Sequence, residues 1–467
     1  MSQNHRNQRE DPNIKEFALQ FEAMLSNEEN HFMEEATYES LADYYFLNGN
    51  LDLATTACEM GVLSYPNSLQ LQLIRTELHI ANNDFNKALD LLDQVSILNP
   101  SDSEVSFLRG VVMDLMGDHI QALEIFQEIL PITPDKDAVY FQLGIVFQHL
   151  DEYEKAVLCF KKAAIKNPEN HPALYELVHS IEESDEVEAY IPFFQELTEN
   201  DPFAYVAWFC LGMCHNHVGD TEATIAAYQY AVAIKEDFFM GWFNLGHVFM
   251  NTEQYSEAQD AYTTAVKLDE NAETYTHLAA SFEKVDDFRT AYKNYRKATE
   301  LEETYADAWF GMASVLYEEG RCMEAVHFIK KAIKLREENG DYWLLLGDTE
   351  AQLGNFLSSV EAYEKAVTYD PLNLDTWLNW SLLFWELKEH GKALDIIQEG
   401  LHELPDEADL HYRAAVYLVF AGNYNEAYRY LETGLTLNYD AHTQIYDFFT
   451  ELETQKTLHQ IIQQYKE

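Results

Sequence analysis

The sequence predicts an all-α solenoid of about twelve helix–turn–helix units, and two residue spacings with the same period predict it. Prolines recur every 34 residues, at Pro66, Pro100, Pro134, Pro168 and Pro202, and again at Pro371 and Pro405. Tryptophans recur every 34 residues from Trp208 to Trp242 and from Trp309 through Trp343 to Trp377. The tryptophan series requires the loss of one residue between Trp242 and Trp309, which are 67 residues apart. The proline series requires the same loss between Pro202 and Pro371. A period of this length is typical of stacked helical hairpins.

The residues inside one period have the spacing of two amphipathic helices. In the unit from Asp137 to Pro168, apolar residues recur at intervals of three and four, which places them on one face of each helix. They are Tyr140, Leu143, Gly144 and Phe147 on the first helix, and Ala156, Phe160 and Ala163 on the second. The small residues Gly144 and Ala156 mark the place where the two helices can approach closely. Pro168 ends the second helix, because its ring prevents the helix from continuing.

These residues resemble the signature of tetratricopeptide repeats, and twelve units can be aligned from Glu35 to Tyr439. Some units depart from the pattern, as where Arg75 and Arg109 replace the Leu of the first helix. In its general character, the sequence also resembles long tetratricopeptide proteins common in Bacteroidota. The resemblance implies a right-handed superhelical solenoid with helical end caps. We therefore divide the chain into a polar tail and N-terminal capping helix (1–34), twelve repeats (35–439) and C-terminal capping helices (440–467).

Charge restricts the class of partner. The chain has 81 acidic and 30 basic side chains, a formal net charge of −51, so it repels nucleic-acid phosphates and anionic membrane surfaces. A basic or neutral protein partner remains, although the acidity can also serve solubility alone. No apolar stretch is long enough for a spanning helix, so we expect no membrane insertion. The five cysteines are odd in number and lack the spacing of a disulfide framework, which favours a reducing cytoplasm.

Motifs for catalysis are absent from the sequence. It contains no phosphate-binding loop, no dinucleotide-binding glycine pattern, no metalloprotease HExxH and no nucleophile elbow, so we expect no enzyme, no catalytic residue and no cofactor. Cys210, Cys214 and His217 share one helix face and could in principle bind a metal ion. Zinc sites usually draw ligands from separated segments, whereas buried cysteine acts as a small apolar residue. We favour packing and expect no metal site, and the sequence leaves the alternative open.

In tetratricopeptide repeats the inner groove is lined by first-helix residues at positions 2, 5, 9 and 12 of each unit. In this chain those 48 positions carry thirteen acids and no Lys or Arg. The resemblance therefore argues against the family's dicarboxylate clamp, which requires basic groove residues. The predicted groove acids include Asp307, Asp341, Asp348 and Asp375, with the aromatic residue Phe310 beside them.

The sixth and seventh units have no acid at these positions. Aromatic and methionine side chains stand there instead, and such side chains suit a buried peptide or helix. The predicted contact residues are Phe209, Met213, Met240, Phe243 and Met250. Each ring could equally serve packing between repeats, and that alternative stays open.

Two functional hypotheses follow from the sequence. The first is a cytoplasmic scaffold or adaptor that binds a peptide or helix of a protein partner, with basic flanks, in an acidic, aromatic-lined groove. The second is an architectural subunit of a larger complex that uses its convex face or its ends. The sequence leaves the partner, the pathway and the oligomeric state open.

Overall fold

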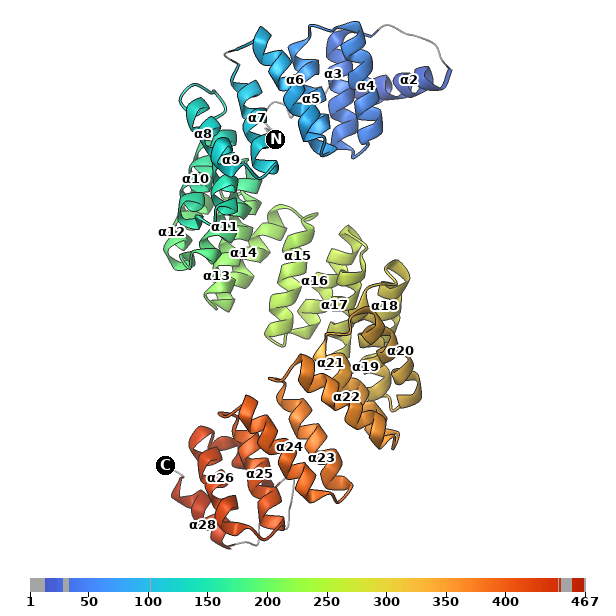
Figure 1. Cartoon of the computed structure of the whole chain (residues 1–467), viewed down its shortest axis with the longest axis vertical. Coiled ribbons are helices and arrows are strands. Elements are labelled where there is room, and N and C mark those ends of the chain that lie inside the picture. The colour runs from blue at the N-terminus through green and yellow to red at the C-terminus, as the bar shows by residue number, and fades with distance from the viewer. Residues whose placement is uncertain (1–12, 28–32, 101, 444, 447–455, 466–467) are drawn as a thin grey trace. The chain divides into compact units, whose positions relative to one another are not determined.

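A computed structural model describes residues 13–27, 33–100, 102–443, 445–446 and 456–465. The chain divides into two compact units, Met1–Glu236 and Asp237–Glu467, which Figure 1 colours from blue to green and from green to red. Within the described ranges we find α-helices, one short 3-10 helix and no β-strand, which confirms the predicted all-helical class. No helix in those ranges has the length and apolar character needed to cross a membrane.

In the part of the first unit that the structure describes, there are an N-terminal helix and six helix pairs. The single helix is α2 (Ile14–Asn27). The pairs are α3 (Glu35–Leu47) with α4 (Leu51–Ser64), α5 (Leu69–Ala81) with α6 (Phe85–Leu98), α7 (Ser103–Leu115) with α8 (His119–Ile129), α9 (Lys136–His149) with α10 (Tyr153–Lys166), α11 (His171–Glu183) with α12 (Val187–Asn200), and α13 (Tyr205–His217) with α14 (Thr221–Ile234).

Among its described residues, the second unit contains six more pairs and two short C-terminal elements. The pairs are α15 (Phe239–Asn251) with α16 (Tyr255–Leu268), α17 (Ala272–Glu283) with α18 (Phe288–Leu301), α19 (Ala306–Glu318) with α20 (Cys322–Leu335), α21 (Gly340–Gln352) with α22 (Phe356–Tyr369), α23 (Leu374–Glu386) with α24 (His390–Glu403), and α25 (Ala408–Phe420) with α26 (Tyr424–Leu437). The 3-10 helix η1 (Asp440–Thr443) and α28 (Lys456–Gln464) follow.

The turn inside each pair needs one residue with a left-handed backbone, and this residue marks the period. Six of these residues are glycines with φ between 73° and 87°, and six are non-glycine residues with φ between 56° and 62°. Successive turn residues are 34 apart, except that Glu253 and Asp286 are 33 apart. The missing residue lies in the loop between α16 and α17, which has three residues where the loop from α14 to α15 has four. The predicted deletion is therefore confirmed and located.

The two helices of a pair approach where the sequence predicts. A Cβ atom added at Gly144 would lie 2.5 Å from Cε1 of Phe160, and one added at Gly246 would lie 2.6 Å from Cε1 of Tyr262. Ala156, Phe160 and Tyr262 are fully buried. Glycine on the first helix therefore makes room for a ring on the second helix, and this contact repeats along the chain.

Helices cover both ends of the array. On α2, Phe21 and Met24 are buried, and the Tyr45 hydroxyl of α3 donates to the backbone oxygen of Ala18 at 3.2 Å. On α28, Leu458 and Ile462 are buried. Residues 1–12 of the predicted polar tail and residues 447–455 of the predicted C-terminal cap lie outside the described residues.

Candidate partner-binding surface

The first helices of successive pairs contact one another within each unit. In the first unit these contacts join α3 to α5, α5 to α7, α7 to α9 and α11 to α13, and in the second unit they join α17 to α19, α19 to α21 and α21 to α23. Ring contacts between α15 and α17 extend the second row, since His247 and His277 have centroids 4.4 Å apart. Each row of first helices carries residues of the predicted groove.

In the first unit, Phe209 belongs to the core. Its side chain is 1% exposed, and its ring stacks on Tyr228 with centroids 5.2 Å apart. The edge of Tyr175 meets the same ring at 6.0 Å. Met213 is half-buried and packs against the same core. For Phe209 the arrangement favours the packing alternative, because the ring is already covered by residues of its own unit.

In the second unit, α15 presents a more accessible surface. Met240 is 46% exposed, while Phe243, His247 and Met250 are half-buried. We call these four residues the α15 patch. The Phe243 ring stacks on Phe239 at 5.5 Å and meets the edge of His247 at 4.5 Å. Its neighbours hold this ring in place, while Met240 reaches into solvent beside it.

Two of the predicted acids bond to the repeat that follows them. Asp307 at the start of α19 accepts hydrogen bonds from the Tyr342 hydroxyl and from Nη1 of Arg336, the latter at 3.3 Å. Asp348 on α21 accepts from the Tyr363 hydroxyl at 2.6 Å and from Asn379 Nδ2 at 3.2 Å. Burial raises the pKa of Asp348 although both hydrogen bonds oppose the rise. These two carboxylates therefore connect helices inside the unit.

The acids at the starts of α21 and α23 are more accessible. Asp341 and Asp375 are exposed, and Asp341 accepts a hydrogen bond from Asn373 Nδ2 at 3.2 Å. Partial burial and the nearby Asp370 raise the pKa of Asp341. Phe310, one repeat earlier, is half-buried and stacks on Tyr342 with centroids 4.8 Å apart. Of the four acids Asp307, Asp341, Asp348 and Asp375, only Asp341 and Asp375 are exposed.

The cysteine group lies inside the first unit. Cys210 and Cys214 are fully buried among apolar side chains, whereas His217 is exposed with Nδ1 3.9 Å from Glu182 Oε1. Burial raises the pKa of the Cys214 thiol to about 12 and that of Cys210 well above its usual value. A metal ion binds the thiolate, so burial of this kind opposes ligation and favours packing.

We therefore expect the thiols of the native protein to be unreactive. All five cysteines are free and buried, and burial also raises the pKa of Cys159 to about 11. Ellman's reagent requires an accessible thiolate, so it should label the folded chain slowly at pH 8. All five thiols should react in guanidinium chloride. Fast labelling of one thiol in the folded state would contradict the described burial.

His247 of the α15 patch and its neighbour His277 on α17 predict a pH-dependent stability. Burial lowers the pKa of His247 to about 4, the nearby His277 adds to this decrease, and Glu273 opposes it. Burial also lowers the pKa of His277, and Asp307 opposes that decrease. In the unfolded chain both rings take up protons near pH 6.5, so the unfolded state binds more protons below that pH. Stability is then fully present above about pH 6.5 and falls as the pH decreases toward 4.

Between pH 7 and pH 5 we expect a loss on the order of 1–2 kcal/mol, a figure reduced for the part of each ring that solvent reaches. Thermal unfolding of the wild type and of His247→Gln at both pH values measures this loss. The variant should lose less stability on acidification. Equal losses in the two proteins would show that other groups control the acid sensitivity.

The comparisons with known proteins agree with this architecture. Sequence profiles described as tetratricopeptide repeat match residues 77–137, 138–164, 239–272, 310–368 and 344–408. The match to 239–272 spans the pair α15 and α16, and the match to 138–164 lies within the pair α9 and α10. The fold is an all-helical solenoid of tetratricopeptide type. A search of curated proteins finds no match, so the likeness to repeat proteins of Bacteroidota stays an expectation.

Several solved structures match parts of this chain. A chain of the APC/C hetero-tetramer Cut9-Hcn1 has 14% identity and a TM-score of 0.43, covering 83% of this chain and 97% of that one. The MamA protein has 21% identity and a TM-score of 0.33, covering 36% of this chain and 91% of its own. YrrB, described as a TPR protein with an unusual peptide-binding site, has 21% identity and a TM-score of 0.34, covering 42% of this chain and 97% of its own.

Proposed function

We propose that this chain is a non-catalytic protein-interaction scaffold that binds a peptide or helix of a partner along the first helices of its second unit. Repeats of this class generally form such scaffolds. The α15 patch supplies the apolar contact, and Asp341 and Asp375 receive basic residues of the partner. The unpaired, buried cysteines are consistent with a reducing compartment such as the cytoplasm.

The observation that carries the proposal is the accessibility of Met240 beside a ring that its own unit holds in place. An exposed methionine adapts to different apolar partners, and a fixed aromatic ring provides contact area at little entropic cost. No acid occupies the α15 patch, whereas acids begin the first helices α17, α19, α21 and α23. A partner would then meet an apolar contact at one end of the row and negative charge along the rest.

The spacing of the helices sets the length of the partner segment. Neighbouring packed helices lie about 8–10 Å apart, so three steps from α15 to α21 cover about 25–30 Å. An extended segment of about nine residues spans this distance at about 3.3 Å per residue. A helix of about 20 residues spans it as well. We therefore expect apolar anchors and basic residues separated by one of these two lengths.

A displayed library of random 20-residue peptides, selected on the full-length protein, tests the proposal. Enriched peptides should combine apolar anchors with Lys or Arg, and Met240→Ala should weaken their binding by about tenfold, since good contact residues contribute over 1 kcal/mol. Asp375→Lys should slow association and reduce its salt dependence. Met323→Ala is the matched control, because Met323 is exposed on the second helix α20.

Exposed apolar residues on second helices favour the architectural alternative. Met323 on α20 is 75% exposed, and Leu357 on α22 is also exposed. If the selected peptides bind the Met240→Ala variant as well as the wild type and lose binding with Met323→Ala, the second-helix face is the binding surface. The proposal for the first helices would then be abandoned.

A further inference from the structure

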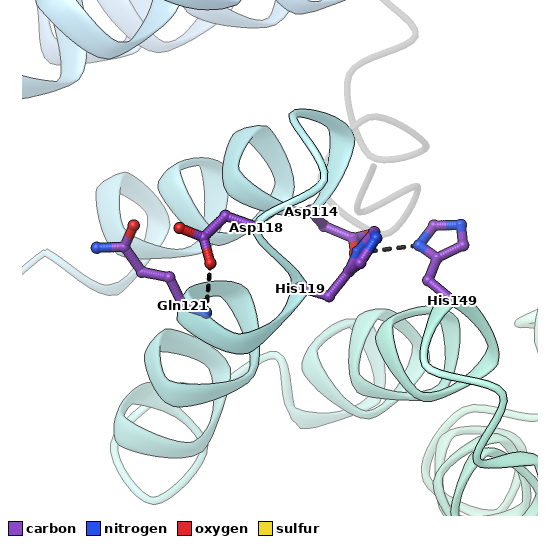
Figure 2. A network of polar contacts seen from close by, with 5 residues as sticks. All are labelled: Asp114, Asp118, His119, Gln121 and His149. Carbon is purple, nitrogen blue, oxygen red and sulfur yellow. Dashed lines mark hydrogen bonds and ion pairs between the residues drawn. The ribbon is translucent and has the colours of Figure 1, made fainter.

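Among the residues that the structure describes, one group of three metal-ligand side chains converges from three helices of the first unit. Asp114 lies in the last turn of α7, His119 begins α8 and His149 ends α9. Figure 2 shows both imidazole rings directed at the Asp114 carboxylate. Their ligand atoms all lie within 4.8 Å of one another.

The contacts are short and share one oxygen atom. Nδ1 of His119 lies 2.7 Å from Oδ1 of Asp114, and Nδ1 of His149 lies 3.0 Å from the same oxygen. The Asp114 side chain is 3% exposed, whereas that of His149 is 44% exposed. The carboxylate is therefore buried at the base of the group, and the His149 ring leaves a route from solvent. Asp118, also in Figure 2, is engaged separately, since it accepts the Gln121 backbone N–H at 3.1 Å.

We propose that Asp114, His119 and His149 form a binding site for a divalent transition-metal ion of the Zn²⁺ type, which joins the third and fourth repeats. Two imidazoles and one carboxylate suit Zn²⁺ or Co²⁺, whereas Mg²⁺ and Ca²⁺ prefer sets of oxygen ligands. Three protein ligands from separate segments leave a fourth position for water. The high negative charge of the chain raises the local concentration of cations.

The geometry requires a small movement to accept the ion. Ligand atoms about 2.0–2.1 Å from a tetrahedral zinc ion lie about 3.4 Å from one another. The two nitrogen–oxygen distances of 2.7 and 3.0 Å must therefore open by about 0.7 and about 0.4 Å. An imidazole that donates a proton from Nδ1 in one neutral tautomer presents a lone pair at Nδ1 in the other. Exchange of the tautomer replaces the two hydrogen bonds with bonds to the ion.

This site is independent of the proposed partner surface, and it departs from the sequence-based expectation of no metal. The ion connects α7 and α8 of one repeat to α9 of the next. Its binding should therefore stabilise the junction between these repeats, because a ligand that binds only the folded state shifts the unfolding equilibrium. We expect Zn²⁺ to raise the melting temperature of the wild type.

Calorimetric titration of the chelator-treated full-length protein with Zn²⁺ tests the inference. Millimolar Mg²⁺ should be present to occupy exposed carboxylates. The wild type should bind one equivalent, and His149→Ala should bind about 100-fold more weakly or not at all, since even residues behind metal ligands contribute about 10- to 100-fold. The His149 side chain is 44% exposed, so the variant should fold, and Asp114→Asn provides a second test. With Co²⁺, the visible absorption of a four-coordinate ion should appear in the wild type alone.

Two control variants separate the outcomes. His79→Ala removes an imidazole whose Nδ1 lies 3.5 Å from Oδ2 of Asp84, and Lys87 pairs with the same carboxylate. This variant should leave Zn²⁺ binding unchanged. His217→Ala should also leave it unchanged. Loss of binding in His217→Ala but not in His149→Ala would place the ion at Cys210 and Cys214 and overturn the inference. Equal weak binding by the wild type and His149→Ala would show that the three residues form a hydrogen-bonded cluster only.

Discussion

Replacing Phe209 by alanine should destabilise the first unit by about 3–5 kcal/mol, the usual cost of removing a fully buried aromatic side chain. The ring is 1% exposed and lies against Tyr228 and Tyr175, so its removal leaves a cavity between α11, α13 and α14. Differential scanning calorimetry measures the loss. Hydrogen exchange then locates it, because amides in these three helices should lose protection.

The matched control for this substitution is Phe203→Ala. Phe203 is exposed in the loop before α13, and its truncation should change the free energy of unfolding by less than about 0.5 kcal/mol. A small effect of Phe209→Ala, comparable with that of Phe203→Ala, would mean that the Phe209 ring is accessible in solution. The residue would then return to the list of candidate partner contacts.

Replacing Gly246 by valine should destabilise the second unit by about 3 kcal/mol, at the upper end of the usual cost of overpacking. The first added atom, Cβ, would lie 2.6 Å from Cε1 of Tyr262, and Tyr262 is fully buried. The ring is enclosed and cannot move aside, so α15 and α16 must separate. Urea unfolding followed by circular dichroism measures the change.

Gly391→Val is the control for the effect of valine itself. Gly391 lies in the first turn of α24, and an added Cβ atom there meets nothing within 4 Å. This variant should retain the wild-type stability to within about 0.5 kcal/mol, as expected of an exposed substitution. If both glycine variants lose the same amount, contact with the Tyr262 ring does not explain the effect of Gly246→Val.

The repeat architecture could be predicted because it depends on local rules that recur along the chain. Proline at the ends of second helices, glycine opposite a ring and a left-handed turn residue each leave a signal at the same place in each period. The single deletion is visible in the tryptophan spacing, and it appears again as the shortened interval between the turn residues Glu253 and Asp286. Twelve copies of a weak local pattern therefore specify the fold.

The properties of the surface could not be read from the period. Phe209 and Phe243 occupy the same position in two consecutive repeats, yet Phe209 is buried and Phe243 is half-buried. The acid at the start of α19 bonds to Tyr342 of the next repeat, whereas the equivalent Asp375 is exposed. The exposure of each ring and the bonding of each acid depend on which side chains the neighbouring helices supply. A count of acids along the sequence does not include that information.

The cluster of Asp114 and His149 gives a further case. These residues are 35 positions apart, which is about one period. A carboxylate late in one first helix and a histidine late in the next first helix therefore indicate a contact between neighbouring repeats. Asp114 stands at position 12 of its repeat, which is a groove position, so its charge by itself predicts a groove acid and not a contact with the next repeat. Pairs separated by one period are the contacts that a solenoid forms between neighbours.

Photo-crosslinking in living cells tests the central claim most directly, since it compares the two faces of the second unit at matched side chains. A photoreactive amino acid is placed at Met240 on α15 in one variant and at Met323 on α20 in another, both exposed positions. We expect a crosslinked protein adduct from position 240 and none from position 323, with the attached segment rich in apolar and basic residues. An adduct from position 323 alone would contradict the account and assign partner binding to the second helices.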